Sequence, residues 1–311
     1  MKQNDYQIVA TELAFPEGPV VMPDGSVIVV EIATGRVTRI AQDGRKTVVA
    51  EPGGGPNGAA IGPDGALYIC NNGGFNWRRD EAGSLHPAGQ ASDYTGGRIE
   101  RIDLNTGSVE ILYTHSDKAQ LKGPNDIVFD RQGGFWCTDH GKVRDREQDR
   151  GAVLYGRIDG SGLTEVIFPM HGPNGVGLSP DEKTLWVAET FTCRLWAFDV
   201  TAPGCIKADP RPGAMHGGRL VGAPDGLRGF DSLAVDEDGN VCIGQIYSGA
   251  ILVVSPLGEI VEEIPMPDPF ATNIAFGGAD GRDAFVTLSS TGQLLKFRHD
   301  RPGLALNEKH Q

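Results

Sequence analysis

Six side chains that carry oxygen recur at one position of an internal repeat. Six 17-residue segments align without gaps, and they begin at residues 15, 55, 123, 172, 229 and 271. Their third residues, which we call the anchor residues, are Glu17, Asn57, Asn125, Asn174, Asp231 and Asn273. None is Lys or Arg, so carboxylates that converged here would repel one another and lose hydration. A bound cation removes this cost, and oxygen donors alone favour a hard ion, Ca²⁺ first and Mg²⁺ or Mn²⁺ next.

The anchor residues also have a purely structural interpretation. Pro-Asn-Gly, at 56–58 and 173–175, is a common turn sequence, so each of these asparagines taken alone indicates a turn. Turn chemistry would not select Glu17 for the same slot. We therefore expect three or four anchors to bind a metal ion, with water completing the shell and leaving positions for a substrate.

The segments around the anchors predict β-hairpins. Each has a short apolar strand, a turn of the Asp-Gly type, and a second strand rich in Val, Ile, Trp and Phe. Gly stands eight residues after the anchor in five segments, and Glu182 takes that place in the fourth. Further strands follow, for example at 36–40 and 46–50, so one repeat has about four strands. The shorter spacings between anchors match the ~40–50 residues of a propeller blade.

These repeats predict an all-β fold, a six-bladed β-propeller that occupies residues 1–311 as a single domain. The last repeat has about three strands, and we expect residues 6–13 to add the fourth and close the ring. Loop insertions are expected at 72–97 and 140–151. The first of these could be a lid over the channel mouth, or a loop folded over the rim of its blade.

Residues at the ends of the second strands should return to the mouth where the anchors lie. They include Asp139 and Glu189, which could support the ligands, contact substrate, or be solvated strand ends. The residues predicted to contact substrate are Asn57, Asn273, Asn72, Trp77, Asp139, His140 and Glu189.

Composition excludes several classes of protein. With 44 Gly and 20 Pro in 311 residues the chain is no helical bundle, and its net charge of −13 disfavours binding to nucleic acid. No apolar run is long enough to span a membrane, and no secretory signal is recognised. Five Cys without a Cys-x-x-Cys spacing favour a reducing cytoplasm over a disulfide framework. The expected partner is a small-molecule substrate, and the oligomeric state stays open.

Five motifs resemble the regucalcin (senescence marker protein)/gluconolactonase family of metal-dependent lactonases, which includes bacterial drug-responsive lactonases. They are F-P-E-G-P-V (15–20), G-P-N-D (123–126), P-N-G-V-G-L-S-P-D-E-K-T-L (173–185), F-D-S-L-A-V-D-E-D-G-N-V (230–241) and T-N-I-A-F-G-G (272–278). The resemblance covers nearly the whole chain.

The resemblance implies a six-bladed propeller with one divalent ion held from different blades. Matched by motif, Glu17, Asn174 and Asp231 correspond to metal ligands, and Asn125 to an asparagine that contacts metal or substrate. Ca²⁺ is expected first, with Mg²⁺, Mn²⁺ or Zn²⁺ as alternatives. The implied reaction is hydrolytic opening of a lactone, with a sugar-acid lactone as the expected substrate.

In this reaction the ion would polarise the lactone carbonyl and stabilise the oxyanion. Asp231 would be both ligand and general base, and Asn125 would orient the substrate. Asp231 is followed by Ser232 where the family usually has Gly, and Cys137 to Lys142 departs from the family's third-blade motif. These departures weaken the assignment of a particular sugar lactone, but not of the ligands.

The sequence is also compatible with three other functions. A phosphotriesterase-type hydrolase could use the same metal site, with Asp231 attacking phosphorus. A non-enzymatic scaffold would not need carboxylates at the mouth, and the dipeptides typical of WD40 platforms are absent. A condensing enzyme similar to strictosidine synthase would not need the full set of anchors, so the presence of all six disfavours this function.

Overall fold

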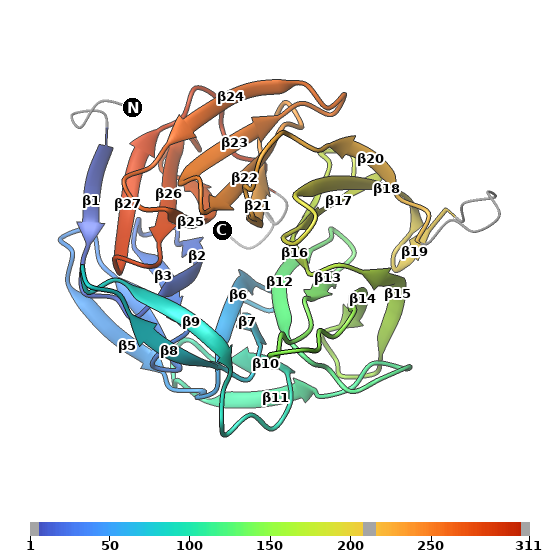
Figure 1. Cartoon of the computed structure of the whole chain (residues 1–311), viewed down its shortest axis with the longest axis horizontal. Helices are drawn as coiled ribbons and strands as arrows, with labels where there is room; N and C mark the ends of the chain where they lie inside the picture. The colour runs from blue at the N-terminus through green and yellow to red at the C-terminus, as the bar shows by residue number, and fades with distance from the viewer. Residues whose placement is uncertain (1–5, 208–215, 306–311) are drawn as a thin grey trace.

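The computed structural model describes residues 6–207 and 216–305, and within them it contains strands and turns but no helix. The sheets surround a common centre, with β2, β6, β12, β16, β21 and β25 innermost (Figure 1). We call these six the inner strands. The predicted all-β class is confirmed. Within the same residues, no helix has the length and apolar character that a membrane span requires.

Three sheets have four antiparallel strands each. The first consists of β2 (Pro16–Val21), β3 (Val27–Glu31), β4 (Arg36–Ile40) and β5 (Lys46–Ala50). The second consists of β6 (Pro56–Ile61), β7 (Leu67–Asn71), β10 (Arg98–Ile102) and β11 (Val109–Tyr113). The third consists of β12 (Pro124–Phe129), β13 (Gly134–Asp139), β14 (Gly151–Arg157) and β15 (Leu163–Met170). Between β7 and β10 the chain forms a separate hairpin of β8 (Phe75–Arg79) and β9 (Leu85–Gln90).

The remaining strands form two larger sheets. In the fourth sheet β16 (Pro173–Leu178), β17 (Thr184–Glu189) and β18 (Arg194–Ala202) are followed by β19 (Cys205–Ile206) and β20 (Arg219–Gly222), which both pair with β18. The fifth repeat contains β21 (Phe230–Val235), β22 (Val241–Ile246), β23 (Ala250–Val254) and β24 (Ile260–Pro265). The sixth contains β25 (Phe270–Gly277), β26 (Asp283–Leu288) and β27 (Gln293–Arg298), and β1 (Tyr6–Ala10) pairs with β27.

The fifth and sixth repeats share one eight-stranded sheet, whereas the repeat pattern predicts separate blades. Pairing of Gln245 with Ala271 and of Ile246 with Phe270 joins them. This pairing forms because the end of β22 and the start of β25 meet at the same end of the ring.

The inner strands touch one another in a cycle. β2 contacts β6, β6 contacts β12, β12 contacts β16, β16 contacts β21, β21 contacts β25, and β25 contacts β2. Glycines after the anchors allow this close approach, since a Cβ at Gly18 would clash with the Asn57 carbonyl, and one at Gly58 with that of Asn125. Apolar side chains fill the space between neighbouring sheets. An example is Phe129, whose ring lies 5.1 Å from that of Tyr68 and 5.7 Å from that of Phe135.

The turn that follows each inner strand explains the recurring glycine. Gly25 and Gly65 both have φ +76°, a conformation that costs glycine little. In the fourth repeat Glu182 adopts φ +56° at the equivalent position. Its carboxylate accepts a hydrogen bond from Arg131 N at 3.0 Å, which ties this turn to the neighbouring sheet.

All six inner hairpins contain a β-bulge at the anchor. In the first, Glu17 pairs with Val30, but the next pair is Val20 with Ile28, so the inner strand has one extra residue. The same shift occurs in β6–β7, β12–β13, β16–β17, β21–β22 and β25–β26. In β25–β26 the shift lies just before the anchor, between Ala271 and Asn273. A bulge re-aims the side chains beside it, and every anchor lies beside one.

Candidate functional site

The anchor residues lie at one end of the ring, which we call the anchor end, near the start of each inner strand. Five of them are buried, namely Glu17, Asn57, Asn125, Asn174 and Asn273. Asp231 is half-buried. Asp231 is thus the more accessible of the two anchor carboxylates.

Glu17 is held from the sixth repeat. Its Oε2 accepts hydrogen bonds from Asn273 Nδ2 at 2.9 Å and from Gly18 N at 2.8 Å. Burial nevertheless raises the pKa of the Glu17 carboxyl above its usual value. The predicted substrate residue Asn273 is therefore a partner of the predicted ligand Glu17.

Asp231 lies within the electrostatic field of two other carboxylates. Burial raises the pKa of Asp231 well above its usual value, and the charges of Glu17 and Asp126 raise it further. A hydrogen bond with Asn174 acts in the opposite direction. These groups belong to the first, third, fourth and fifth repeats, so the fold brings together charges that are remote in sequence.

Asn174 is oriented by two hydroxyl groups. Its Nδ2 donates to Thr190 Oγ1 at 3.1 Å, and Ser232 Oγ donates to its Oδ1 at 3.3 Å. Ser232, the residue at which the sequence departs from the family motif, thus supports the predicted ligand Asn174.

Asn125 has an acceptor without a partner. Its Oδ1 is buried and receives no hydrogen bond from any described residue. A buried unpaired oxygen is costly, and a cation or a donor group of a ligand would satisfy it. This atom, together with the carboxylates of Glu17 and Asp231, fits a hard divalent ion.

Asp126 is a buried carboxylate that does not belong to the anchor residues and was not predicted as a site residue. It accepts hydrogen bonds from Val176 N at 3.1 Å and Ile127 N at 3.0 Å, and also from the backbone of Leu233. Burial raises the pKa of Asp126 to about 7, and the charge of Glu17 adds to the increase. The sequence does contain a signal, because the other repeats have Gly, Ser or Ile after the anchor.

The described residues contain no cluster of three or more His, Cys, Asp or Glu side chains placed to hold a metal ion. A metal site at the anchor end must therefore include the amide oxygens of asparagine. This agrees with a hard ion rather than with one that prefers histidine or cysteine.

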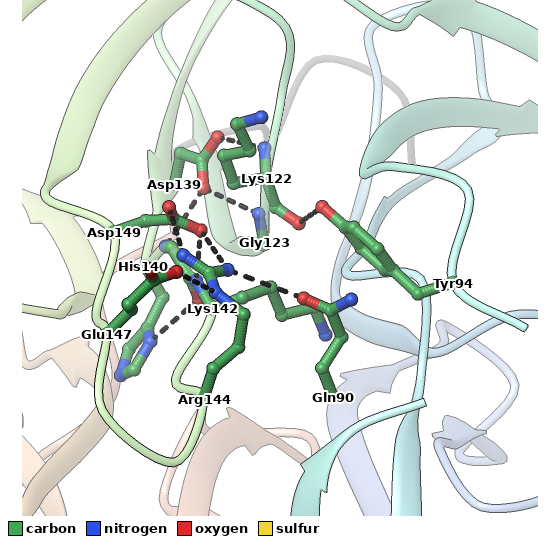
Figure 2. A network of polar contacts seen from close by, with 11 residues as sticks. Gln90, Tyr94, Lys122, Gly123, Asp139, His140, Lys142, Arg144, Glu147 and Asp149 are labelled. Atoms are coloured by element: carbon green, nitrogen blue, oxygen red, sulfur yellow. Dashed lines mark hydrogen bonds and ion pairs between the residues drawn. The ribbon is translucent and has the colours of Figure 1, made fainter. Parts of the chain in front are cut away.

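The polar residues at the ends of the second strands mainly hold the backbone. Asp139 accepts hydrogen bonds from Lys122 N and Gly123 N, both at 2.7 Å (Figure 2). Glu189 accepts from His171 N at 2.7 Å, and its other oxygen accepts from Thr192 and Trp196. Glu31 and Asn71 bind Ala14 N and Gly55 N in the same way. These contacts occupy both carboxylate oxygens of Asp139 and of Glu189 and give the two side chains a structural role, whereas their contact with substrate stays a prediction.

His140 is the first residue of the second insertion and does not form a dyad with Asp139. Its Nδ1 lies 3.3 Å from the Gly141 carbonyl oxygen, and its ring packs against Phe191 at 5.0 Å. Burial lowers the pKa of His140 to about 4, so the imidazole is neutral near pH 7.

Aromatic side chains surround part of the anchor end. Trp77, on β8, packs 5.0 Å from Phe15, and Phe270 lies 6.2 Å from Phe15 and 5.9 Å from Tyr247. Phe15 has φ +58°, a left-handed conformation that Gly229 adopts at the equivalent position of the fifth repeat. Such strain in a bulky residue persists only where surrounding contacts fix it. The β8–β9 hairpin thus packs on the entrance to the first inner strand.

A family model described as SMP-30/Gluconolactonase/LRE-like region matches residues 15–290, and the chain belongs to this family. The lactonase drp35 of Staphylococcus haemolyticus is 31% identical over 81% of this chain and 69% of the relative. That of Staphylococcus saprophyticus is 31% identical over 68% of this chain, which matches only 57% of that relative's length.

Solved structures agree with this assignment. A gluconolactonase of Xanthomonas campestris has a TM-score of 0.71 at 25% identity, covering 96% of this chain and 89% of that chain. Regucalcin of Agrobacterium tumefaciens, a calcium-binding protein, has a TM-score of 0.72 at 19% identity and covers 97% of both chains. The latter likeness supports the fold.

Proposed function

We propose that the chain is a lactonase that depends on a divalent metal ion bound by the anchor residues. The observation that carries the proposal is the set of oxygen atoms at the anchor end, in which Asn125 Oδ1 has no hydrogen-bond partner among the described residues and Asp231 is partly exposed. The relatives named lactonase and gluconolactonase support lactone hydrolysis as the reaction.

The proposed architecture is a single six-bladed β-propeller over residues 1–311. The cyclic contacts of the inner strands and the pairing of β1 with β27 support six blades and closure by the N-terminal strand. The two insertions, 72–97 and 140–151, would then border the anchor end. The β8–β9 hairpin is the proposed lid.

Glu17, Asn125, Asn174 and Asp231 would hold the ion, with Ca²⁺ expected first. When bound, it supplies positive charge that polarises the lactone carbonyl. Glu17 is fixed by Asn273 and Asn174 by Ser232, so these side chains are already oriented for a ligand. The calcium-binding regucalcin with the same fold supports the choice of ion.

Asp231 is proposed as the general base. Its partial exposure lets a water molecule reach the carboxylate, whereas Glu17 is closed off by burial. Asp231 would take a proton from the water that attacks the carbonyl carbon. The ring C–O bond would then break, and the proton would pass to the alkoxide oxygen that leaves. Asn125, and Asn57 beside it, would orient the lactone, with Trp77 as an apolar contact.

A panel of lactones, assayed with and without chelator, tests the function. It should contain D-glucono-1,5-lactone, other aldonolactones and alkyl-substituted γ-lactones. We expect hydrolysis that chelator abolishes and Ca²⁺ restores, with aldonolactones preferred. Activity that is insensitive to thorough chelation would contradict metal dependence, and no turnover of any lactone would contradict the reaction.

A further inference from the structure

A buried lysine connects the two insertions at the anchor end. Lys142 is 2% exposed, and its Nζ donates to Gly74 O at 2.8 Å and to Asn72 Oδ1 at 3.3 Å. The same Nζ lies 4.3 Å from the centre of the Phe75 ring and 5.2 Å from that of Tyr94. An ammonium group thus lies between loop 140–151 and the base of the β8–β9 hairpin.

The acidic groups near Lys142 are engaged elsewhere. Asp139 binds the backbone N–H groups described above, and Asp149 pairs with Arg144 at 2.8 Å (Figure 2). Burial lowers the pKa of Lys142 to about 7, although the charges of Asp139 and Asp149 act in the opposite direction. Burying the Lys142 ammonium costs free energy, so we expect Lys142 to make a contact that no other residue in this region provides.

That contact fixes the orientation of the Asn72 amide. Asn72 Oδ1 receives the Lys142 ammonium and also Gly74 N at 2.8 Å. Turning the amide over would place its NH₂ group against two donors, so the network permits one orientation. Asn72 Nδ2 is then buried without a hydrogen-bond partner among the described residues, although the side chain is only 3% exposed.

Asn72 lies at the anchor end of the second repeat. It follows β7, whose last residue Asn71 pairs with Pro56, and its backbone N–H binds Gly55 O at 2.8 Å. The anchor Asn57 directly follows Pro56 on the inner strand β6. Among the described residues, Asn72 Nδ2 is an unpaired donor in the second repeat and Asn125 Oδ1 an unpaired acceptor in the third. A ligand rich in oxygen, such as a lactone, could satisfy the donor.

We propose that Lys142 is a positioning residue that holds the Asn72 amide so that Nδ2 donates a hydrogen bond to an oxygen of the bound lactone. This inference rests on the proposed lactonase function. Asn72 contacts the substrate, whereas Lys142 acts through Asn72.

Four variants separate these roles in steady-state assays of the metal-loaded enzyme. Asn72→Asp keeps an acceptor for Lys142 and Gly74 N but removes the donor, so it should fold normally and lose about tenfold in kcat/KM. Lys142→Met should lose a similar factor, mainly through KM. Adding Lys142→Met to Asn72→Ala should cost nothing further, because the two residues act in series.

Lys118→Met is the matched control, since its side chain is 63% exposed and pairs with Asp117, and it should keep wild-type kinetics. Thermal melts identify variants that fail to fold. If Lys142→Met or the double variant fails to fold, the kinetics of Asn72→Asp alone test the inference. Wild-type kcat/KM in Asn72→Asp, or additive losses in the double variant, would overturn the inference while leaving the lactonase proposal intact. Absence of lactone turnover in the wild type would overturn both.

Discussion

At the scale of single residues, the anchor end is costly for the ligand-free protein. Glu17 and Asp231 are carboxylates whose pKa values are raised by burial, and the charge of Glu17 adds to the effect on Asp231. Their hydrogen-bond partners are amide, hydroxyl and backbone N–H groups, which orient the carboxylates without neutralising them. A protein retains such a set where a ligand uses it.

Replacing Asp231 by Asn should remove most turnover, by a factor of about 10²–10⁴, because the proposed base and one ligand charge are lost together. Initial rates with the preferred lactone at saturating Ca²⁺ measure this. Asp238→Asn, an exposed change in the turn of the same hairpin, is the control. Near-normal activity of Asp231→Asn would rule out the proposed role.

Replacing Glu17 by Gln should weaken Ca²⁺ binding but stabilise the metal-free protein. The neutral amide fills the same space and removes a buried charge, which we expect to raise the free energy of unfolding by about 1–3 kcal/mol. Urea unfolding in chelator and calorimetric titration with Ca²⁺ measure the two effects. Unchanged affinity for Ca²⁺ would show that Glu17 is not a ligand.

Lys142 should make stability depend on pH. Its pKa is about 7 in the folded protein against 10.5 for an ordinary lysine, so between these values the unfolded chain binds more protons. The free energy of unfolding should therefore rise with pH from about 7 to about 10, relative to Lys142→Met. Parallel denaturation curves of the two proteins across this range test the sign, and a constant difference would contradict it.

At the scale of elements, one type of contact recurs where the second strand ends in the first four inner hairpins. Asp139 and Glu189 bind backbone N–H groups of the segment that enters the inner strand, as Glu31 and Asn71 also do. The sequence placed these residues at the anchor end, but alternation along a strand cannot show whether a side chain at its end faces a ligand or the backbone beside it.

Glu189→Ala should destabilise the protein without changing how it binds substrate. It would leave His171 N and Trp196 Nε1 without their acceptor, at a cost of about 2–4 kcal/mol. Chemical denaturation measures the loss, and KM of the folded fraction should stay at the wild-type value. A large rise in KM with unchanged stability would instead support the original prediction of a substrate contact.

At the scale of the whole molecule, the repeat predicted the strands and the position of the anchors well. The constant offset from anchor to glycine exists because each turn needs a left-handed residue, as Gly25 and Glu182 both show. The sequence could not predict the pairing of β22 with β25, nor the burial of Lys142, because both depend on contacts between segments remote in sequence. The repeat does not predict the role of Asp126, because its burial depends on contacts with Val176 and Leu233 from two other repeats.

Separate repeats are proposed to hold one divalent ion at the anchor end. Anomalous diffraction from crystals of the protein loaded with Mn²⁺ tests this proposal, because it locates the ion among the side chains. We expect one strong peak within coordination distance of Glu17 and Asp231, absent in crystals of Glu17→Gln. A protein that turns over lactones while its crystals show no peak between these two carboxylates would rule out the proposed metal site.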